Sequence, residues 1–117
     1  SVCYDLRFPE LFRQLQAEGA DILVVPAAFT HVTGEAHWEP LLRARAIENQ
    51  CYVLGSAQGG RHSPTRLTWG HSQIIDPWGR VLASCGGEGP ALALATRDPE
   101  AQDRLRRSMP VASHRRL

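Results

Sequence analysis

The stretch SVCYDLRFPELFRQLQAEGADILVVP, residues 1–26, decides the fold class of this chain. Its apolar residues recur at the i, i+3, i+4 and i+7 spacing of an amphipathic helix: Phe8, Leu11, Phe12 and Leu15. Pro9 suits the first turn of this helix, and Gly19 suits its C-terminal cap. The continuous apolar run from Ile22 to Val25 is typical of a parallel strand that is buried on both faces. With Val2 to Tyr4 as the end of an earlier strand, the stretch predicts a βαβ unit.

A second helix is predicted from about His37 to Gln50, after a linker from Ala27 to Ala36. Pro40 is tolerated only in the first turn of a helix, which places the start of this one near residue 37. Glu39 and Arg43 then lie at i and i+4 on the helix surface, where opposite charges form a pair.

The second half of the chain predicts strands that turn back on themselves. The expected elements are a buried strand from Cys51 to Leu54, an exposed loop from Gln58 to Thr68, a hairpin of His71 to Ile75 with Arg80 to Ser84, a short strand from Ala91 to Ala95, and a helix capped by Asp98. The hairpin turn is Asp76-Pro77-Trp78-Gly79, whose Pro and Gly occupy favoured positions of a type I turn. The sequence therefore predicts an α/β fold with a parallel part followed by an antiparallel edge.

Composition and charge exclude several classes of function. The 117 residues, 43% of them hydrophobic, suit one packed domain. No apolar run approaches the roughly 20 residues that cross a bilayer, and no stretch resembles a signal peptide, so we expect a cytoplasmic protein without a membrane partner. The net charge of +1 gives no general attraction to nucleic acid, and the arginines from Arg104 to Arg116 lack interleaved aromatic residues that stack on bases. We expect no nucleic-acid partner.

Cys3 is the candidate nucleophile. It stands where a strand ends and a helix begins, at the sheet edge where open α/β folds bind ligands. The N–H groups of such a turn favour a thiolate and an oxyanion alike. Cysteine is also among the most buried residue types, so position alone leaves a nucleophile and a structural side chain equally open. The other two cysteines, Cys51 and Cys85, are interpreted as structural, and the five histidines lack the spacing of a metal site, so no metal and no cofactor is expected.

Four segments resemble the carbon-nitrogen hydrolase (nitrilase) superfamily: SVCYDLRFPE, VVPAAF, HWEPLLRARAIENQCYV and GHSQIIDPWGRVLA. The resemblance extends over essentially the whole chain. The pairing of CYDLRFPE with LLRARAIENQCYV is most similar to the branch that contains deaminated glutathione amidase, with ω-amidase as a close relative. The resemblance implies a four-layer α-β-β-α sandwich. Residues 1–117 are expected to supply its C-terminal half, as a single partial domain that lacks the N-terminal half.

The resemblance also implies a reaction. Cys3 would attack the amide carbon of a small carboxylate-bearing amide, expel the amine and leave a thioester that water hydrolyses. The substrate-binding residues that it implies are Tyr4, through its backbone N–H, Arg7, Ala28, Phe29 and Thr30. For Arg7 the alternative is a structural ion pair with Asp5 or Glu10. For the segment 28–30 the alternative is a plain loop after a strand.

One departure from the superfamily changes the expected activity. Superfamily enzymes use a Glu-Lys-Cys constellation in which the glutamate and the lysine precede the cysteine, and this chain contains no lysine. Both residues are therefore expected in a segment before Ser1, and residues 1–117 alone are predicted to be inactive. The full-length protein is expected to be a homodimer. The alternative function is a noncatalytic half-domain that completes or binds another chain.

Overall fold

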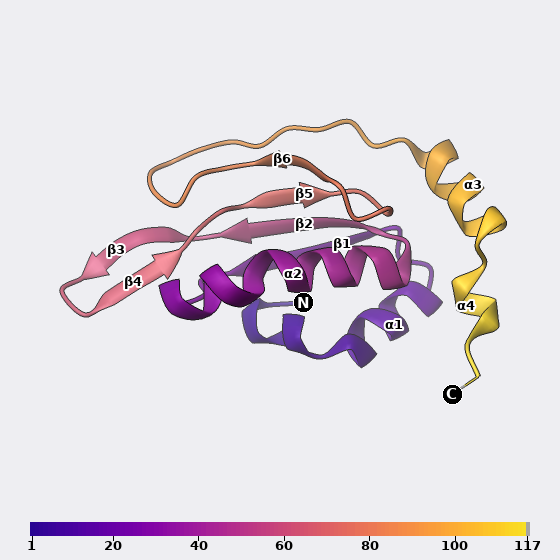
Figure 1. The fold of residues 1–117 in the computed structure, drawn as a ribbon, viewed down its shortest axis with the longest axis horizontal. Coiled ribbons are helices and arrows are strands. Elements are labelled where there is room, and N and C mark those ends of the chain that lie inside the picture. Colours follow the sequence, from indigo (N-terminus) through magenta and orange to yellow (C-terminus); the bar gives the residue numbers. More distant parts are fainter. Residues whose placement is uncertain (117) are drawn as a thin grey trace.

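A computed structural model describes residues 1–116, which form a four-stranded sheet with helices packed on one face (Figure 1). The strands of this sheet are β1 (Ile22–Ala27), β2 (Tyr52–Ala57), β5 (Gln73–Ile75) and β6 (Val81–Ser84). Their order is β1-β2-β5-β6, with β1 and β2 parallel and the other two pairs antiparallel. The predicted α/β fold with a parallel part and an antiparallel edge is confirmed.

The chain begins with a short helix in place of the predicted strand end. The helices are η1, a 3-10 helix (Cys3–Arg7), α1 (Pro9–Ala17), α2 (His31–Asn49), α3 (Pro99–Ser108) and α4 (Val111–His114). Val2 is extended, but Cys3 has φ 48° and starts η1, so the prediction of a strand over residues 2–4 is wrong. The predictions of α1 and α3 are confirmed, and the Asp98 side chain accepts a hydrogen bond from the Ala101 N–H at 2.9 Å, as a helix N-cap does.

Helix α2 begins at His31, before the predicted start, and Pro40 lies inside it. Its first turn is formed by a bond from the Gly34 N–H to the Thr30 carbonyl at 2.7 Å. The predicted pair of Glu39 with Arg43 is wrong because each bonds to the sheet side. Glu39 accepts from the Gln73 amide at 3.0 Å, and Arg43 donates to the Gly79 carbonyl at 2.8 Å. These hydrogen bonds to the sheet side hold α2 in place on both sides of Pro40.

The segment predicted as an exposed loop is a second hairpin, of β3 (Gly59–Ser63) and β4 (Arg66–Trp69). It is anchored at its base, where the Trp69 N–H donates to the Phe29 carbonyl at 2.9 Å. Its Gly, Ser and Arg residues are typical of a loop. The hairpin therefore depends on this tertiary contact, which its composition does not indicate. The other hairpin is confirmed, since the Gly79 N–H closes its turn on the Asp76 carbonyl at 2.9 Å.

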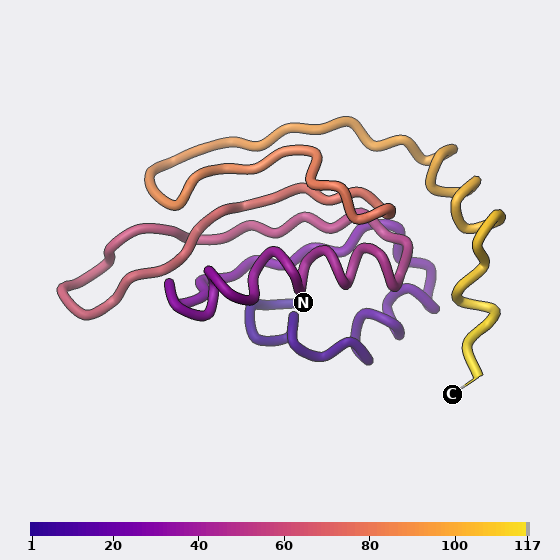
Figure 2. The backbone as a smooth tube through the Cα atoms, viewed as in Figure 1, coloured from indigo at the N-terminus to yellow at the C-terminus, as the bar shows by residue number. Residues whose placement is uncertain are grey.

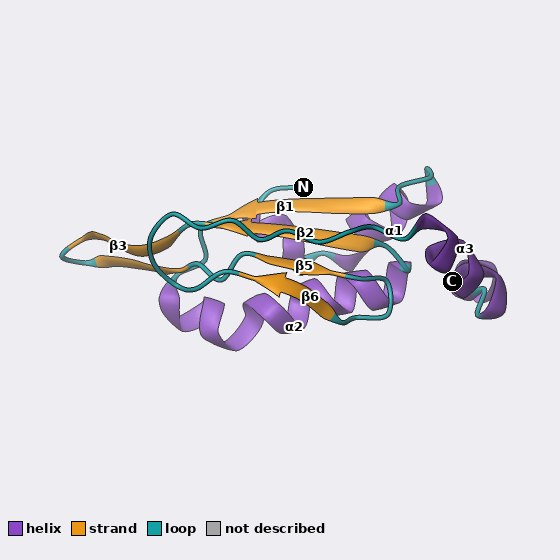
Figure 3. Ribbon diagram, turned by 90° about the horizontal axis from the view of Figure 1, so that it is seen from above, coloured by secondary structure: helices purple, strands orange, loops and turns teal. Residues whose placement is uncertain are grey.

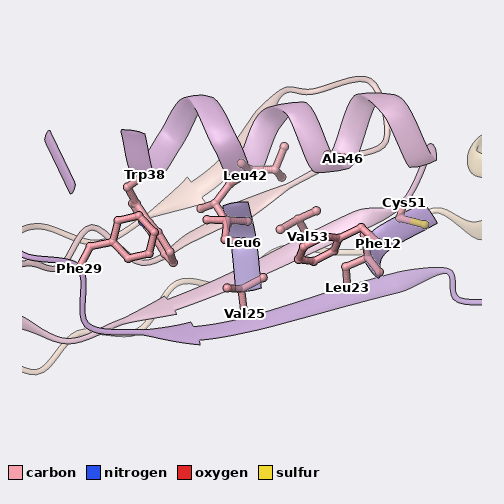
Figure 4. Close-up of a cluster of buried hydrophobic side chains, with 11 residues drawn as sticks. Leu6, Phe12, Leu23, Val25, Phe29, Trp38, Leu42, Ala46, Cys51 and Val53 are labelled. Carbon is pink, nitrogen blue, oxygen red and sulfur yellow. The ribbon is translucent and has the colours of Figure 1, made fainter. Parts of the chain in front are cut away.

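The apolar core fills the space between the helices and one face of the sheet (Figure 4). Its buried side chains include Leu6, Phe12, Leu23, Val25, Trp38, Leu42 and Val53. Leu6 comes from η1, so the first turn of the chain is part of the core. The trace in Figure 2 shows α1 and α2 running beside each other below this sheet. Within residues 1–116, no helix combines the length and the apolar character needed to span a membrane.

The other face of the sheet is largely uncovered. Ile22 and Val24 are 41% and 51% exposed, so burial of this strand on both faces is not found in residues 1–116. The extended segment 86–97 crosses that face (Figure 3) and leaves an apolar cavity of about 260 Å³ lined by Leu54, Ile74 and Leu94 among others. The predicted strand from Ala91 to Ala95 is wrong, because this segment is extended without pairing in the sheet. Two of the four layers that the resemblance implies are thus present.

Candidate active site

Cys3 has an unusual backbone conformation. Its φ of 48° lies in the left-handed region, which residues other than glycine rarely adopt and which clusters at active sites. The Ser1 hydroxyl donates to the Val24 carbonyl at 2.8 Å and ties this end of the chain to β1. Cys3 is half-buried and packs against the core. The thiol is thus held at a sharp turn beside the edge strand, and its surface is open to solvent in part.

The turn that carries Cys3 is closed by Asp5. The Asp5 carboxylate accepts from the Val2 N–H at 2.8 Å, and the Asp5 N–H donates to the Val2 carbonyl at 3.0 Å. Tyr4 is the second residue of η1, so its N–H has no acceptor within the helix. An N–H group next to a thiol in this position is the donor that an oxyanion needs.

Arg45 of α2 anchors η1. Its Nε and Nη2 atoms both donate to the Leu6 carbonyl, at 3.0 and 2.8 Å. Its Nη1 forms a salt bridge with Glu48 at 2.9 Å, and the guanidinium lies 5.5 Å from the centroid of the Phe12 ring. Arg45 is only 5% exposed. Arg45 is not among the site residues predicted from the sequence. The available signal was an arginine on the helix face that also carries Leu42 and Ala46.

Arg7 lies in an aromatic cradle at the exposed end of the turn. Its guanidinium carbon is 5.4 Å from the centroid of the Tyr4 ring and 5.1 Å from that of Phe29. Its Nη1 is 3.2 Å from Nδ1 of His37. Within residues 1–116 it forms no salt bridge with a carboxylate, so the alternative of an ion pair with Asp5 or Glu10 is not found. The arginine is a half-buried cation whose neighbours here are two aromatic rings and an imidazole.

The segment after β1 meets this cradle at one residue. Phe29 is 6% exposed and packs against Trp38 with ring centroids 5.1 Å apart, while its other neighbour is Arg7. Ala28 is half-buried. Thr30 is exposed, and its contacts join it to α2 and the hairpin, through the Thr33 hydroxyl at 2.7 Å and a bridge to Thr68. The structure therefore brings together Tyr4, Arg7 and Phe29 of the predicted site, and adds His37.

Comparison with known proteins assigns the family. The family model described as carbon-nitrogen hydrolase matches residues 1–107, a range that contains η1, Phe29 and α2. The chain belongs to the carbon-nitrogen hydrolase family. The resemblance stated from the sequence segments is confirmed by this match.

Three relatives of this carbon-nitrogen hydrolase chain illustrate the match. Deaminated glutathione amidase of Rattus norvegicus is 57% identical over 116 residues, which are 99% of this chain and 35% of that protein. The crystal structure of the C. elegans NitFhit protein has a TM-score of 0.96 and 53% identity, covering 99% of this chain and 28% of that one. A mutant of an amidase from Nesterenkonia sp. AN1, with the acetamide moiety of fluoroacetamide added covalently at its active-site cysteine, has a TM-score of 0.74 and 29% identity over 98% of this chain and 39% of that one. The chain thus spans about a third of the length of the rat relative.

Cys51 provides an internal reference for the reactivity of Cys3 in this carbon-nitrogen hydrolase chain. Its thiol is buried and lies 3.2 Å from the Ala20 carbonyl and 3.3 Å from Arg106. Burial raises the pKa of the Cys51 thiol, and the nearby Arg106 offsets this only in part. The stability linked to this thiol is therefore complete below the pKa of an unfolded cysteine, and it is lost as the pH rises from that value through the raised pKa of the folded protein. Residues 1–116 contain no group of three or more His, Cys, Asp and Glu side chains that could hold a metal ion.

We expect iodoacetamide to modify Cys3 at least about tenfold faster than Cys51 at neutral pH, because a thiol must be accessible and ionised to react. Peptide mapping by mass spectrometry at successive times measures both rates. In urea the two rates should converge, which controls for sequence effects. Equal rates in the folded protein would contradict the placement of Cys3.

Proposed function

We propose that Cys3 is the nucleophile of a thiol amidohydrolase that cleaves the C–N bond of a small carboxylate-bearing amide. The observation that carries this proposal is the left-handed Cys3 at the start of η1, next to the Tyr4 N–H. Two relatives support it. The Rattus norvegicus relative is named a deaminated glutathione amidase, and the Nesterenkonia amidase is modified at an active-site cysteine. The activity proposed for the whole protein is therefore close to that of deaminated glutathione amidase.

In the proposed reaction the Cys3 sulfur forms a bond to the amide carbon, and the carbonyl oxygen becomes an oxyanion that accepts from the Tyr4 N–H. The C–N bond then breaks, and the nitrogen takes the proton that the Cys3 thiol has given up and leaves as the amine. Water attacks the resulting thioester, releases the carboxylic acid and returns the proton to sulfur. One difficult displacement is thus divided into two easier ones.

Arg7 is the proposed anchor for the carboxylate of the substrate. A guanidinium has five N–H donors in a planar fork that matches a carboxylate. In this structure one nitrogen of Arg7 meets His37, and the aromatic rings of Tyr4 and Phe29 contact its face without supplying a counter-ion. The charge of Arg7 is therefore available to an anionic ligand that binds next to Cys3.

The proposal requires two groups that residues 1–117 do not provide in full. The family resemblance implies a glutamate as the general base and a lysine as a second oxyanion donor, and the chain contains no lysine. Loss of one oxyanion donor alone costs about 10²–10³ in rate. The polypeptide of residues 1–117 by itself is therefore expected to show no measurable amide hydrolysis.

The test compares this polypeptide with the protein expressed from the complete reading frame that contains it. Release of ammonia or amine is measured with two matched short ω-amides, one with a free carboxylate and one with that carboxylate esterified. The complete protein is expected to hydrolyse the free acid at least about tenfold better. Cys3-dependent hydrolysis by residues 1–117 alone would contradict the proposal that the general base and the second oxyanion donor come from outside these residues. Absence of hydrolysis by the complete protein would contradict the proposed function.

The second candidate function is a noncatalytic half-domain that completes another chain. The observation that favours it is the uncovered sheet face, where Ile22 and Val24 are 41% and 51% exposed. A Cys3 thiol that stays unreactive toward amides in the complete protein would favour this candidate. A cytoplasmic location, a homodimer and the absence of nucleic-acid and membrane partners stay predictions.

A further inference from the structure

The contact between Arg7 and His37 indicates which nitrogen of the histidine ring accepts a hydrogen bond. Nη1 of Arg7 lies 3.2 Å from Nδ1 of His37. A guanidinium carries only donors and stays protonated, so Nδ1 must accept the hydrogen bond with its lone pair. A neutral imidazole that accepts at Nδ1 carries its proton at Nε2. His37 is therefore neutral, in the Nε2–H form, whenever this contact is made.

His37 is also held in place by the residue that follows it. Trp38 is fully buried, and its Nε1 donates to the His71 carbonyl at 2.8 Å. This bond fixes the turn of α2 that presents His37 to η1. The histidine itself is exposed, so the core does not depend on it. Its ring is thus a polar acceptor on a rigid support.

The alternative positions open to Arg7 show what the histidine does. Asp5 and Glu10 are carboxylates within three residues of Arg7 in the chain, and an ion pair with either would neutralise the guanidinium. In the structure Arg7 turns instead to His37 of α2 and to the ring of Phe29, and neither of them is a carboxylate. A neutral acceptor such as the imidazole of His37 can hold the guanidinium of Arg7 without neutralising its positive charge.

We propose that His37 is a positioning residue, which as the neutral Nε2–H tautomer holds Arg7 in its aromatic cradle and keeps its charge free for the carboxylate of the substrate. This inference rests on the proposed function, since it assigns His37 to the same site. His37 need not touch the substrate. It acts through the orientation of the guanidinium, so its loss should weaken substrate binding and leave the chemistry at Cys3 unchanged.

The test uses His37→Ala and His37→Asn in the protein from the complete reading frame. The side-chain oxygen of asparagine can replace Nδ1 as an acceptor. For the ω-amide with a free carboxylate, we expect KM to rise about tenfold in H37A with kcat within about twofold, and H37N to stay within about threefold of the parent. For the esterified amide, neither variant should change KM. Equal effects on the two amides, a loss confined to kcat, or an H37N variant as impaired as H37A would overturn the proposal.

A second measurement tests the inference if no amide is hydrolysed, an outcome that would contradict the proposed function alone. Long-range ¹H–¹⁵N NMR of the histidine rings reports which nitrogen of His37 carries the proton. We expect an unprotonated Nδ1 in the parent protein and a measurably larger fraction of the Nδ1–H form in Arg7→Met. A proton on Nδ1, or a tautomer that is unchanged in R7M, would overturn the inference.

Discussion

Replacing Cys3 by alanine is expected to lower kcat for amide hydrolysis by at least about 10⁴-fold in the protein from the complete reading frame. Without the sulfur no thioester forms, and the remaining oxyanion donors act only on a direct attack by water. Cys3 starts a helix at φ 48°, and alanine, which also carries a Cβ, is strained there to about the same degree, so the loss should be one of chemistry. Steady-state release of the amine measures it, and circular dichroism checks that the variant is folded.

The matched control is Cys85→Ala. Cys85 is half-buried like Cys3 but lies far along the chain, after β6, where it lines a polar cavity of about 500 Å³ with Ser72 and His62. C85A should keep kcat within about threefold of the parent. If C85A lost as much activity as C3A, or if C3A kept several per cent of it, Cys3 would not be the nucleophile.

Replacing Arg45 by methionine is expected to lower the free energy of unfolding by about 3 kcal/mol. Methionine keeps the apolar contact with Phe12, but the buried Leu6 carbonyl loses both of its Arg45 donors and Glu48 loses its ion-pair partner. Because Leu6 and Cys3 both lie in η1, the same change should also disturb the turn of Cys3 and lower the rate at which iodoacetamide modifies it. Urea unfolding and the iodoacetamide rate of Cys3 measure the two effects.

Arg43→Met is the matched control for this prediction. Arg43 lies on the same helix, is exposed, and makes one hydrogen bond, to the Gly79 carbonyl at 2.8 Å. Its loss should cost about 1 kcal/mol or less and leave Cys3 reactivity unchanged. Equal destabilisation by R43M and R45M would show that Arg45 does not anchor the turn of Cys3.

Local signals in the sequence predicted the elements that local interactions build. The spacing of Leu11 and Phe12 with their neighbours, the turn at Asp76 and Gly79, and the Asp98 cap all lie within a few residues of what they specify, and each is confirmed. The predicted start of α2 near residue 37 is wrong because Pro40 lies inside the helix and not in its first turn, and bonds to the sheet side hold the helix across it. Local rules fail where tertiary contacts take over.

In the candidate site too, local sequence predicted some features, and others depend on tertiary contacts. The position of Cys3 at a turn before a helix followed from the sequence, but its left-handed backbone did not. The bond of Arg45 to Leu6 joins residues 39 apart, and that of Arg7 to His37 joins residues 30 apart, so no spacing rule relates them. Both became visible only when α2 was placed beside η1.

The most direct test of the account is acid quenching during the first turnover of an ω-amide by the complete protein, followed by peptide mapping. We expect a peptide in which the acyl group of the amide has replaced the thiol hydrogen of Cys3, and neutral hydroxylamine should remove this group. Continued turnover with no acyl group on the Cys3 peptide, or an acyl group on Cys85, would contradict the assignment of Cys3 as the nucleophile.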